Sequence, residues 1–260
     1  MSELLRIDLN CDLGESFGNY KLGMDDEVIP HVTSVNVACG YHGGDPMVME
    51  KTVRMAVKHG TAIGAHPSFP DLMGFGRRDM KLTRDEAYAY VKYQLGALYA
   101  FVKSAGGELQ HLKAHGALYN MAGKDMDMAM ALATAIRDFD SQMLLLGLPN
   151  SKMEEAAAEC GIGYVSEFFA DRAYNDDGSL VNRKLEGSVI HDSDLACQRV
   201  LRMVRDNEVV TYTGNVLKLN CKSVCVHGDN AEAVRFVQKI REALKNEGVE
   251  AANMKKVLGK

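Results

Sequence analysis

The sequence predicts an α/β protein whose strands close, or nearly close, into a (β/α) barrel. Short apolar runs alternate with longer segments of helical periodicity, which is typical of parallel strands joined by helices. The 260 residues suit a barrel that folds as one unit, and an apolar fraction of 47% is enough for a sizeable core. We therefore expect one barrel domain spanning residues 1–260. An open, doubly wound sheet is the alternative.

Seven short apolar runs are the candidate strands. Seven strands that alternate with helical segments favour a closed barrel over an open sheet. The predicted strands are residues 6–13, 34–41, 61–66, 109–115, 143–147, 163–169 and 223–227.

The helices between the strands are predicted from their capping residues. Asp45-Pro46 supplies an N-cap and a proline at the first helical position. Thr83 and Ser151 each precede a glutamate by three residues, which is the pattern of a capping box. Helices that begin at these signals end at Gly60, Gly106 and Gly161, a last helix runs from Asp229 or Asn230 to Gly248, and two more lie near 125–139 and 192–206.

Two long polar loops interrupt this alternation, residues 67–81 and 171–186. Loops of this length in a compact domain usually cover or line a binding site. The first carries Arg77 and Arg78, and we expect it to bring an anion-binding guanidinium over the mouth of the barrel. Arginines that are solvated or paired with nearby aspartates are the alternative. A small hairpin is expected at 211–219.

Polar side chains follow the predicted strands on one face. Because side chains alternate along a strand, Asp8, Asn10 and Asp12 share a face of the first strand, and Lys113 and His115 share a face of the fourth. Helices cover the outside of a barrel, so the polar face points inward. Ionisable groups there cost several kcal/mol each unless they are paired, hydrogen-bonded or hydrated, so their presence calls for a function.

Ionisable residues gather at the carboxyl ends of the strands, where βα barrels carry their active sites. Any one of them alone could be a hydrogen-bonded buried group or a helix cap, but the set together indicates a catalytic pocket. The set is Asp12, His42, His66, His115, Glu167, Asp171, His227 and Asp229.

Such a set supports two kinds of chemistry. Carboxylates and imidazoles can hold a divalent metal for hydrolysis, or they can act as a general acid/base array without one. Lys113, beside His115, can bind a carboxylate or phosphoryl group or stabilise an oxyanion. The spacing does not choose among these roles.

Composition and missing motifs exclude several function classes. The net charge of −5 and the lack of a basic, aromatic-rich patch argue against nucleic-acid binding. There is no signal-type segment and no apolar run long enough for a bilayer, so we expect a cytoplasmic protein without membrane contact. Neither a G-x-S-x-G elbow nor a P-loop occurs. The six cysteines form no C-x-x-C pair and are expected to be reduced core thiols.

Six sequence blocks occur in order over almost the whole chain. They are residues 8–15 (DLNCDLGE), 36–46 (NVACGYHGGDP), 66–78 (HPSFPDLMGFGRR), 113–120 (KAHGALYN), 169–174 (FADRAY) and 225–229 (CVHGD). Through these blocks the chain resembles the LamB/YcsF family, whose members are A subunits of bacterial 5-oxoprolinase.

The resemblance implies a seven-stranded (β/α) barrel of the glycoside hydrolase/deacetylase type. It also implies an ATP-dependent enzyme that opens 5-oxo-L-proline to L-glutamate. In that enzyme the chain acts with B and C subunits, and ATP enters through the complex. A divalent metal is a further candidate cofactor.

Residue roles follow from the resemblance and from the strand positions. Catalytic roles in proton transfer and in oxyanion or phosphoryl binding are expected from Asp12, Glu15, Lys113, His115 and Glu167. Substrate binding is expected from His42, His66, Arg77, Arg78, Asp171, Arg172, Tyr174 and His227. The residues expected to hold a metal are Asp12, His42 and His66.

Two other functions remain alternatives. The same barrel can be a stand-alone metal-dependent deacetylase or amide hydrolase, with Asp12, His42 and His66 as metal ligands. It can also be a non-catalytic scaffold or regulatory subunit. The inward-facing ionisable set argues against the scaffold, because a scaffold gains nothing from buried charge.

Overall fold

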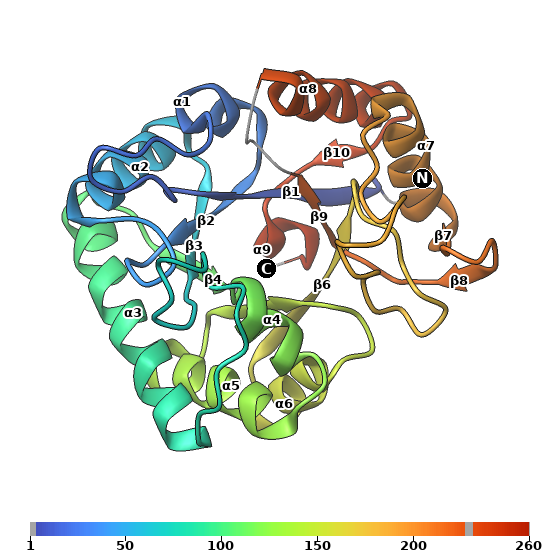
Figure 1. Ribbon diagram of the computed structural model, residues 1–260. Helices are drawn as coiled ribbons and strands as arrows, with labels where there is room; N and C mark the ends of the chain where they lie inside the picture. Colours follow the sequence, from blue (N-terminus) through green and yellow to red (C-terminus); the bar gives the residue numbers. More distant parts are fainter. Residues whose placement is uncertain (1–3, 227–230, 260) are drawn as a thin grey trace.

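Seven parallel strands form a closed barrel in the computed structural model, which describes residues 4–226 and 231–259 (Figure 1). The last barrel strand, β9, pairs with both β6 and β1, and this pairing closes the ring. The seven-stranded barrel that the sequence predicts is therefore confirmed. The barrel strands are β1 (Arg6–Leu13), β2 (Ser34–Ala38), β3 (Ala62–His66), β4 (Leu109–Leu112), β5 (Leu144–Gly147), β6 (Gly163–Phe169) and β9 (Ser223–Val226).

Helices surround the barrel and bury the outward side chains of its strands (Figure 1). Leu9 and Cys11 of β1 and Val35 and Val37 of β2 are fully or almost fully buried under them. The covering helices are α2 (Pro46–His59), α3 (Arg84–Ser104), α4 (Gly116–Ala122), α5 (Met126–Asp140), α6 (Lys152–Cys160), α7 (Ser193–Asp206) and α8 (Ala231–Asn246).

Two of the three predicted caps form as expected. The Asp45 side chain accepts hydrogen bonds from two amides of the first turn of α2, and Thr83 forms a capping box with Glu86 at the start of α3. The capping box predicted at Ser151 is wrong. Ser151 is buried, and its hydroxyl donates to the carbonyl of Leu148 at 2.7 Å instead of accepting from the helix.

Two strands end earlier than predicted. Strand β2 ends at Ala38, because the chain turns at Gly40, whose φ is +91°. Strand β4 ends at Leu112, although the amide of Lys113 still donates to the carbonyl of Ala65 on β3. His227 and Asp229, predicted at the end of the last strand and the start of the last helix, lie outside the described residues.

Several short elements are not predicted from the sequence. Among them, β10 (Glu250–Ala251) pairs with the start of β1 and leads into α9 (Met254–Val257), which lies in the middle of the ring in Figure 1. Met254 packs on Leu144, Leu146 and Val165 inside the barrel. This apolar plug fills part of the barrel interior, and the polar residues occupy the rest. The others are α1 (Asp25–Val28), the 3-10 turn η1 (Ile29–His31) and α4, which was not among the predicted helices.

The predicted hairpin lies beside the barrel. Strands β7 (Glu208–Val210) and β8 (Val216–Lys218) pair antiparallel, and the amide of Thr211 donates to the carbonyl of Asn215 across the turn. The strands flank the turn at Gly214, as the sequence suggested.

In the described ranges, no helix combines the length and the apolar character that crossing a membrane requires.

Candidate active site

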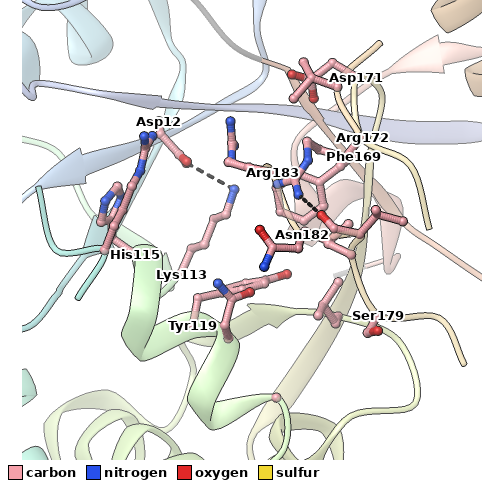
Figure 2. A pocket seen from close by; sticks show the side chains of 18 of the residues that line it. Asp12, Lys113, His115, Tyr119, Phe169, Asp171, Arg172, Ser179, Asn182 and Arg183 are labelled. Carbon is pink, nitrogen blue, oxygen red and sulfur yellow. Dashed lines mark hydrogen bonds and ion pairs between the residues drawn. The ribbon is translucent and has the colours of Figure 1, made fainter. Parts of the chain in front are cut away.

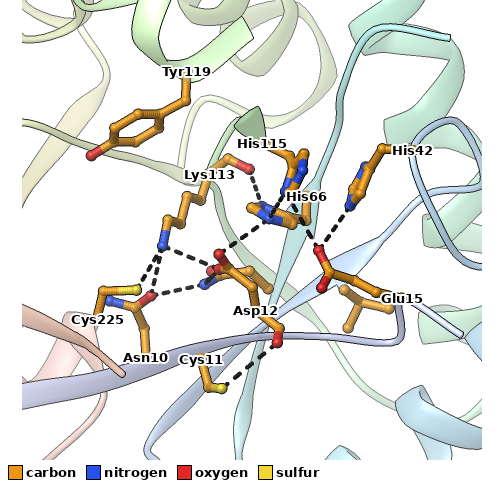
Figure 3. A network of polar contacts seen from close by, with 12 residues as sticks. Asn10, Cys11, Asp12, Glu15, His42, His66, Lys113, His115, Tyr119 and Cys225 are labelled. Carbon is orange, nitrogen blue, oxygen red and sulfur yellow. Dashed lines mark hydrogen bonds and ion pairs between the residues drawn. The ribbon is translucent and has the colours of Figure 1, made fainter. Parts of the chain in front are cut away.

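Lys113 is the centre of a buried charge network inside the barrel (Figure 3). Its side chain is only 2% exposed, and its ammonium lies 3.1 Å from Asp12 Oδ1 and 3.0 Å from Glu167 Oε2. Burial alone would lower the pKa of Lys113, but the carboxylates of Asp12 and Glu167 help raise it well above its ordinary value. The site therefore holds a charged ammonium between two carboxylates.

A chain of hydrogen bonds orients the groups around this ammonium. Burial, and then the charge of Lys113, lower the pKa of His111 to about 3, so its ring is neutral. His111 Nε2 lies 2.6 Å from Asn36 Oδ1, and an amide oxygen only accepts, so Nε2 carries the proton. Asn36 Nδ2 is thereby turned toward Asp12 Oδ1 and Asn10 Oδ1, donating to each at 2.8 Å. Asn10 Oδ1 also accepts from Lys113 at 3.2 Å.

Tyr119 completes the surroundings of Glu167. It lies on α4, and its hydroxyl donates to Glu167 Oε1 at 2.7 Å. Burial and the neighbouring carboxylate raise the pKa of Tyr119 well above its ordinary value, so the phenol remains a donor. Sequence reasoning did not select Tyr119, because its spacing of six residues from Lys113 crosses from a strand into a helix and follows neither period. Its place in the 113–120 block was the only signal.

His66 and His115 face each other with their ring nitrogens, Nε2 and Nδ1, 3.0 Å apart. The opposite nitrogens contact backbone carbonyls: His66 Nδ1 lies 2.7 Å from the oxygen of Lys113, and His115 Nε2 lies 2.9 Å from that of Phe75. Since a carbonyl only accepts, each of these outer nitrogens carries a proton. Burial lowers the pKa of His115 well below its ordinary value, so its ring is neutral and Nδ1 presents a lone pair toward His66.

Glu15 and His42 extend this pair into a four-residue cluster. Glu15 Oε1 lies 3.1 Å from His42 Nε2 and 3.4 Å from His115 Nδ1, and the rings of His42 and His115 stack with centroids 3.7 Å apart. One donor atom from each of Glu15, His42, His66 and His115 lies within 4.8 Å of all the others. The structure thus groups His42 and His66 with Glu15 and His115, whereas Asp12 Oδ1, from the set expected to hold a metal, faces Lys113.

The loop at 67–81 packs directly on this cluster. Phe75 contacts the rings of His42 and His115 edge to face, with centroids 5.5 and 5.0 Å apart. Gly76 has a φ of +63°, and a Cβ at this position would lie 2.2 Å from the hydroxyl of Ser68, so only glycine allows this close path. The loop therefore fixes one wall of the site.

The two adjacent arginines of this loop have different surroundings. Arg77 lines the cavity, with its guanidinium 5.0 Å from the centre of the Phe75 ring. Arg78 does not line it, and its guanidinium pairs with the buried Asp71. Of these two arginines, both expected to bind substrate, only Arg77 lines the cavity, because the Arg78 guanidinium is held by Asp71.

Arg172 and Tyr174 of the second loop differ in their position relative to the cavity. Arg172 borders the cavity but is buried, and its guanidinium donates to the carbonyls of Val181 and Ser188. These hydrogen bonds stabilise the loop. Burial lowers the pKa of Arg172 to about 10. Tyr174 is fully buried and stacks on Phe168 away from the cavity, so the structure does not place it against a substrate.

A cavity of about 1990 Å³ opens over Lys113 (Figure 2). Of the predicted site residues, Asp12, Glu15, His66, Arg77, Lys113, His115, Asp171 and Arg172 line it. Glu167 and His42 lie behind this lining, in contact with Lys113 and Glu15, and His227 is outside the described residues. Further out, the lining is rich in cations, namely Lys21, Lys124, Arg183, Lys184, Arg235 and Lys239.

Comparison with known proteins identifies the family. The family model described as the LamB/YcsF family matches residues 7–259. The chain belongs to the LamB/YcsF family.

Relatives in this family are similar over nearly the full chain. A protein of Alkaliphilus metalliredigens, named as the A subunit of 5-oxoprolinase, is 55% identical over 98% of this chain and 100% of its own length. A protein of the same name from Pyrococcus horikoshii is 52% identical, again over 98% of this chain and 100% of its own. One from Campylobacter jejuni is 55% identical over 95% of this chain and 97% of its own.

Solved structures agree with this placement. The lactam utilization protein from Thermus thermophilus superposes with a TM-score of 0.91 at 44% identity, covering 95% of this chain and 99% of that one. The peptidoglycan deacetylase PdaC from Bacillus subtilis superposes with a TM-score of 0.52 at 10% identity, covering 99% of this chain and 91% of that one. The second likeness concerns the barrel fold alone.

Proposed function

We propose that this chain is the A subunit of an ATP-dependent 5-oxoprolinase, which opens 5-oxo-L-proline to L-glutamate together with B and C subunits in the cytoplasm. The observation that carries the proposal is 52–55% identity with proteins of that name over at least 95% of the chain. The similarity to a lactam utilization protein supports the same substrate class, a cyclic amide.

The chemistry explains why ATP is needed. The lactam is a stable amide and a poor electrophile. Transfer of the γ-phosphoryl group to the lactam carbonyl oxygen, with loss of the lactam N–H proton, yields ADP and a cyclic imidate phosphate, whose former carbonyl carbon is open to attack. Water then adds to that carbon, the C–N bond breaks with a proton passing to the nitrogen, and glutamyl phosphate remains. A second water releases glutamate and phosphate. The partner subunits supply the phosphorylation, and this chain opens the activated ring.

Asp12 is the base in this proposal and Lys113 the cation that binds oxyanion or phosphoryl oxygens. The Asp12 side chain is 17% exposed and lines the cavity, whereas that of Glu167 is fully buried. Water therefore reaches Asp12 and not Glu167. Lys113 is held at the same point by both carboxylates, which suits a fixed positive charge directed at developing negative charge. Glu167 acts by positioning Lys113.

The cationic outer lining has the right charge for the remaining anionic groups. We assign Arg77 and Arg183, which line the cavity, to binding the carboxylate or phosphoryl group of the substrate. The cavity of about 1990 Å³ exceeds the roughly 300–1,000 Å³ typical of small-molecule sites. We therefore assign its outer part to a segment of a partner protein in the complex that delivers the activated substrate.

Reconstitution tests this proposal. The purified chain is combined with its B and C subunits, 5-oxoproline and ATP, and glutamate and ADP are quantified. We expect glutamate only when all three subunits and ATP are present, with one ADP for each glutamate. Glutamate formation by B and C alone would contradict the proposal. Hydrolysis of acetylated sugars by this chain alone, without ATP, would support the deacetylase hypothesis instead.

A further inference from the structure

Two imidazoles of the site present lone pairs to each other with no proton to share when both are neutral. The carbonyls of Lys113 and Phe75 hold the protons of His66 and His115 on the outer nitrogens. The inner nitrogens, 3.0 Å apart, are then two acceptors in contact. Such an arrangement requires either an added proton or a bound cation between them.

The surroundings of these rings match those of metal ligands. A histidine that binds a metal usually donates its second ring N–H to a carboxylate or a backbone carbonyl, which fixes the tautomer and aims the other nitrogen. His66 and His115 both have this support, at 2.7 and 2.9 Å. Their inner nitrogens point toward the same space as Glu15 and His42, as Figure 3 shows.

Three of the six distances between the four ligand atoms are close to those of tetrahedral coordination, and all six are within 4.8 Å. With metal–ligand bonds of about 2.0–2.1 Å, tetrahedral ligand atoms lie about 3.3 Å apart. The contacts His66–His115, Glu15–His42 and Glu15–His115 measure 3.0, 3.1 and 3.4 Å. Three buried imidazoles and one carboxylate also form a donor set that suits zinc, cobalt or nickel better than magnesium or calcium.

We propose that Glu15, His42, His66 and His115 form a binding site for one divalent transition-metal ion beside Lys113. Asp12 is outside this ligand set. Its Oδ1 is held by Lys113 and Asn36, and its Oδ2 lies 3.4 Å from His66 Nε2, so it contacts the cluster from the side. The site is independent of the substrate assigned above and can be tested without substrate or ATP.

A proton on His66 is the competing occupant. Burial lowers the pKa of His66, whereas Asp12 raises it, and the net effect is a rise. A protonated His66 would donate to His115 and leave no place for a metal. The two occupants make opposite predictions about cation binding, so an experiment can distinguish them.

The test titrates the full-length chain, stripped with a chelator, with zinc(II) by calorimetry and with cobalt(II) by visible absorption. We expect one ion per chain and the intense visible bands of four-coordinate cobalt. Glu15→Gln and His115→Ala should weaken binding about 100-fold or more, since even the loss of an outer-shell partner costs 10–100-fold. Asp12→Asn should still bind one ion, and the exposed His59→Ala should bind as the wild type does.

Three outcomes would overturn the site. One is no saturable binding by the wild-type chain, which would indicate a proton in the cluster. Another is unchanged affinity in both Glu15→Gln and His115→Ala. The third is loss of binding in Asp12→Asn with retention in Glu15→Gln, which would move the site to the other carboxylate. Circular dichroism of each variant, and the near-isosteric change at Glu15, separate lost ligands from lost folding.

Discussion

The ammonium of Lys113 and the carboxylate of Glu167 form an ion pair 3.0 Å long, with side chains only 2% and 0% exposed. Removing one partner of such a pair leaves an uncompensated buried charge, which typically costs 3–5 kcal/mol. Here the loss of Lys113 would also leave Asp12 and Glu167 to repel each other. Replacing either residue of this active-site pair should therefore also lower the stability of the barrel.

We predict that Lys113→Ala lowers the free energy of unfolding by about 3–5 kcal/mol. Chemical denaturation measures this value. The matched control is Lys51→Ala, which removes an exposed ion pair with Asp26 and should cost less than about 1 kcal/mol. Equal losses in the two variants would show that the buried network does not stabilise the fold.

We predict that Gly64→Ala disturbs the site through His111. A Cβ on Gly64 would lie 2.2 Å from His111 Nε2, so the ring must move and give up its hydrogen bond to Asn36. Overpacking of this kind costs about 1–3 kcal/mol, and turnover by the reconstituted complex should fall with it. The control is Gly96→Ala in α3, where an added Cβ would meet no atom within 4 Å apart from its chain neighbours and the backbone of its own helix, and the change should stabilise the helix by about 0.5–1 kcal/mol. If Gly64→Ala is as stable and as active as Gly96→Ala, then packing at Gly64 does not affect the site through His111.

We predict a stability change with pH that originates at Asp8. Burial, opposed by hydrogen bonds, raises the pKa of Asp8 from 3.8 to about 6. The folded protein therefore takes up a proton near pH 6 that the unfolded chain does not take up until about pH 4, so the contribution of Asp8 to stability grows as the pH falls through 6 and is lost as it rises. Between pH 7 and 5, wild type should gain about 1 kcal/mol relative to Asp8→Asn. If the curves of unfolding free energy against pH for wild type and Asp8→Asn are parallel, Asp8 is not the source of the pH-dependent stability.

We predict that alanine substitutions of the two adjacent arginines in the 67–81 loop differ in their effect on the rate of glutamate formation. Arg77→Ala should slow glutamate formation about tenfold, roughly the value of one charge-assisted hydrogen bond, because Arg77 lines the cavity. Arg78→Ala should leave the rate within about twofold and only loosen the loop, because it loses an ion pair whose arginine is largely exposed. Steady-state kinetics of the reconstituted complex compares them. A larger rate loss for Arg78→Ala would mean that the cavity extends beyond its present lining.

The barrel and its polar interior were predictable from the sequence because they depend on local patterns. Strand β6 occupies the predicted residues 163–169, and alternation along β1 correctly placed Asn10 and Asp12 on the inner face beside Lys113. Side-chain alternation and capping are properties of a few neighbouring residues, so one sequence is enough to show them.

The partners within the site could not be predicted, because they depend on the path of the chain beyond the strands. Glu15 reaches His115 only because Gly14, with φ of +71°, turns the chain after β1. Arg77 and Arg78 are neighbours in sequence, yet one borders the cavity and the other pairs with Asp71. No spacing rule describes such turns, and for this reason the set expected to hold a metal differs from the cluster that the structure forms.

The most direct measurement is glutamate release by the reconstituted three-subunit complex carrying Asp12→Asn in this chain. The substitution keeps the side-chain shape and removes the carboxylate that both contacts Lys113 and lines the cavity. We predict a rate at least about 100-fold lower, as expected for loss of a general base. The exposed Asp127→Asn should match wild type, and both variants should retain cooperative melting. A fully active Asp12→Asn complex would contradict the assignment of this network as the reactive centre.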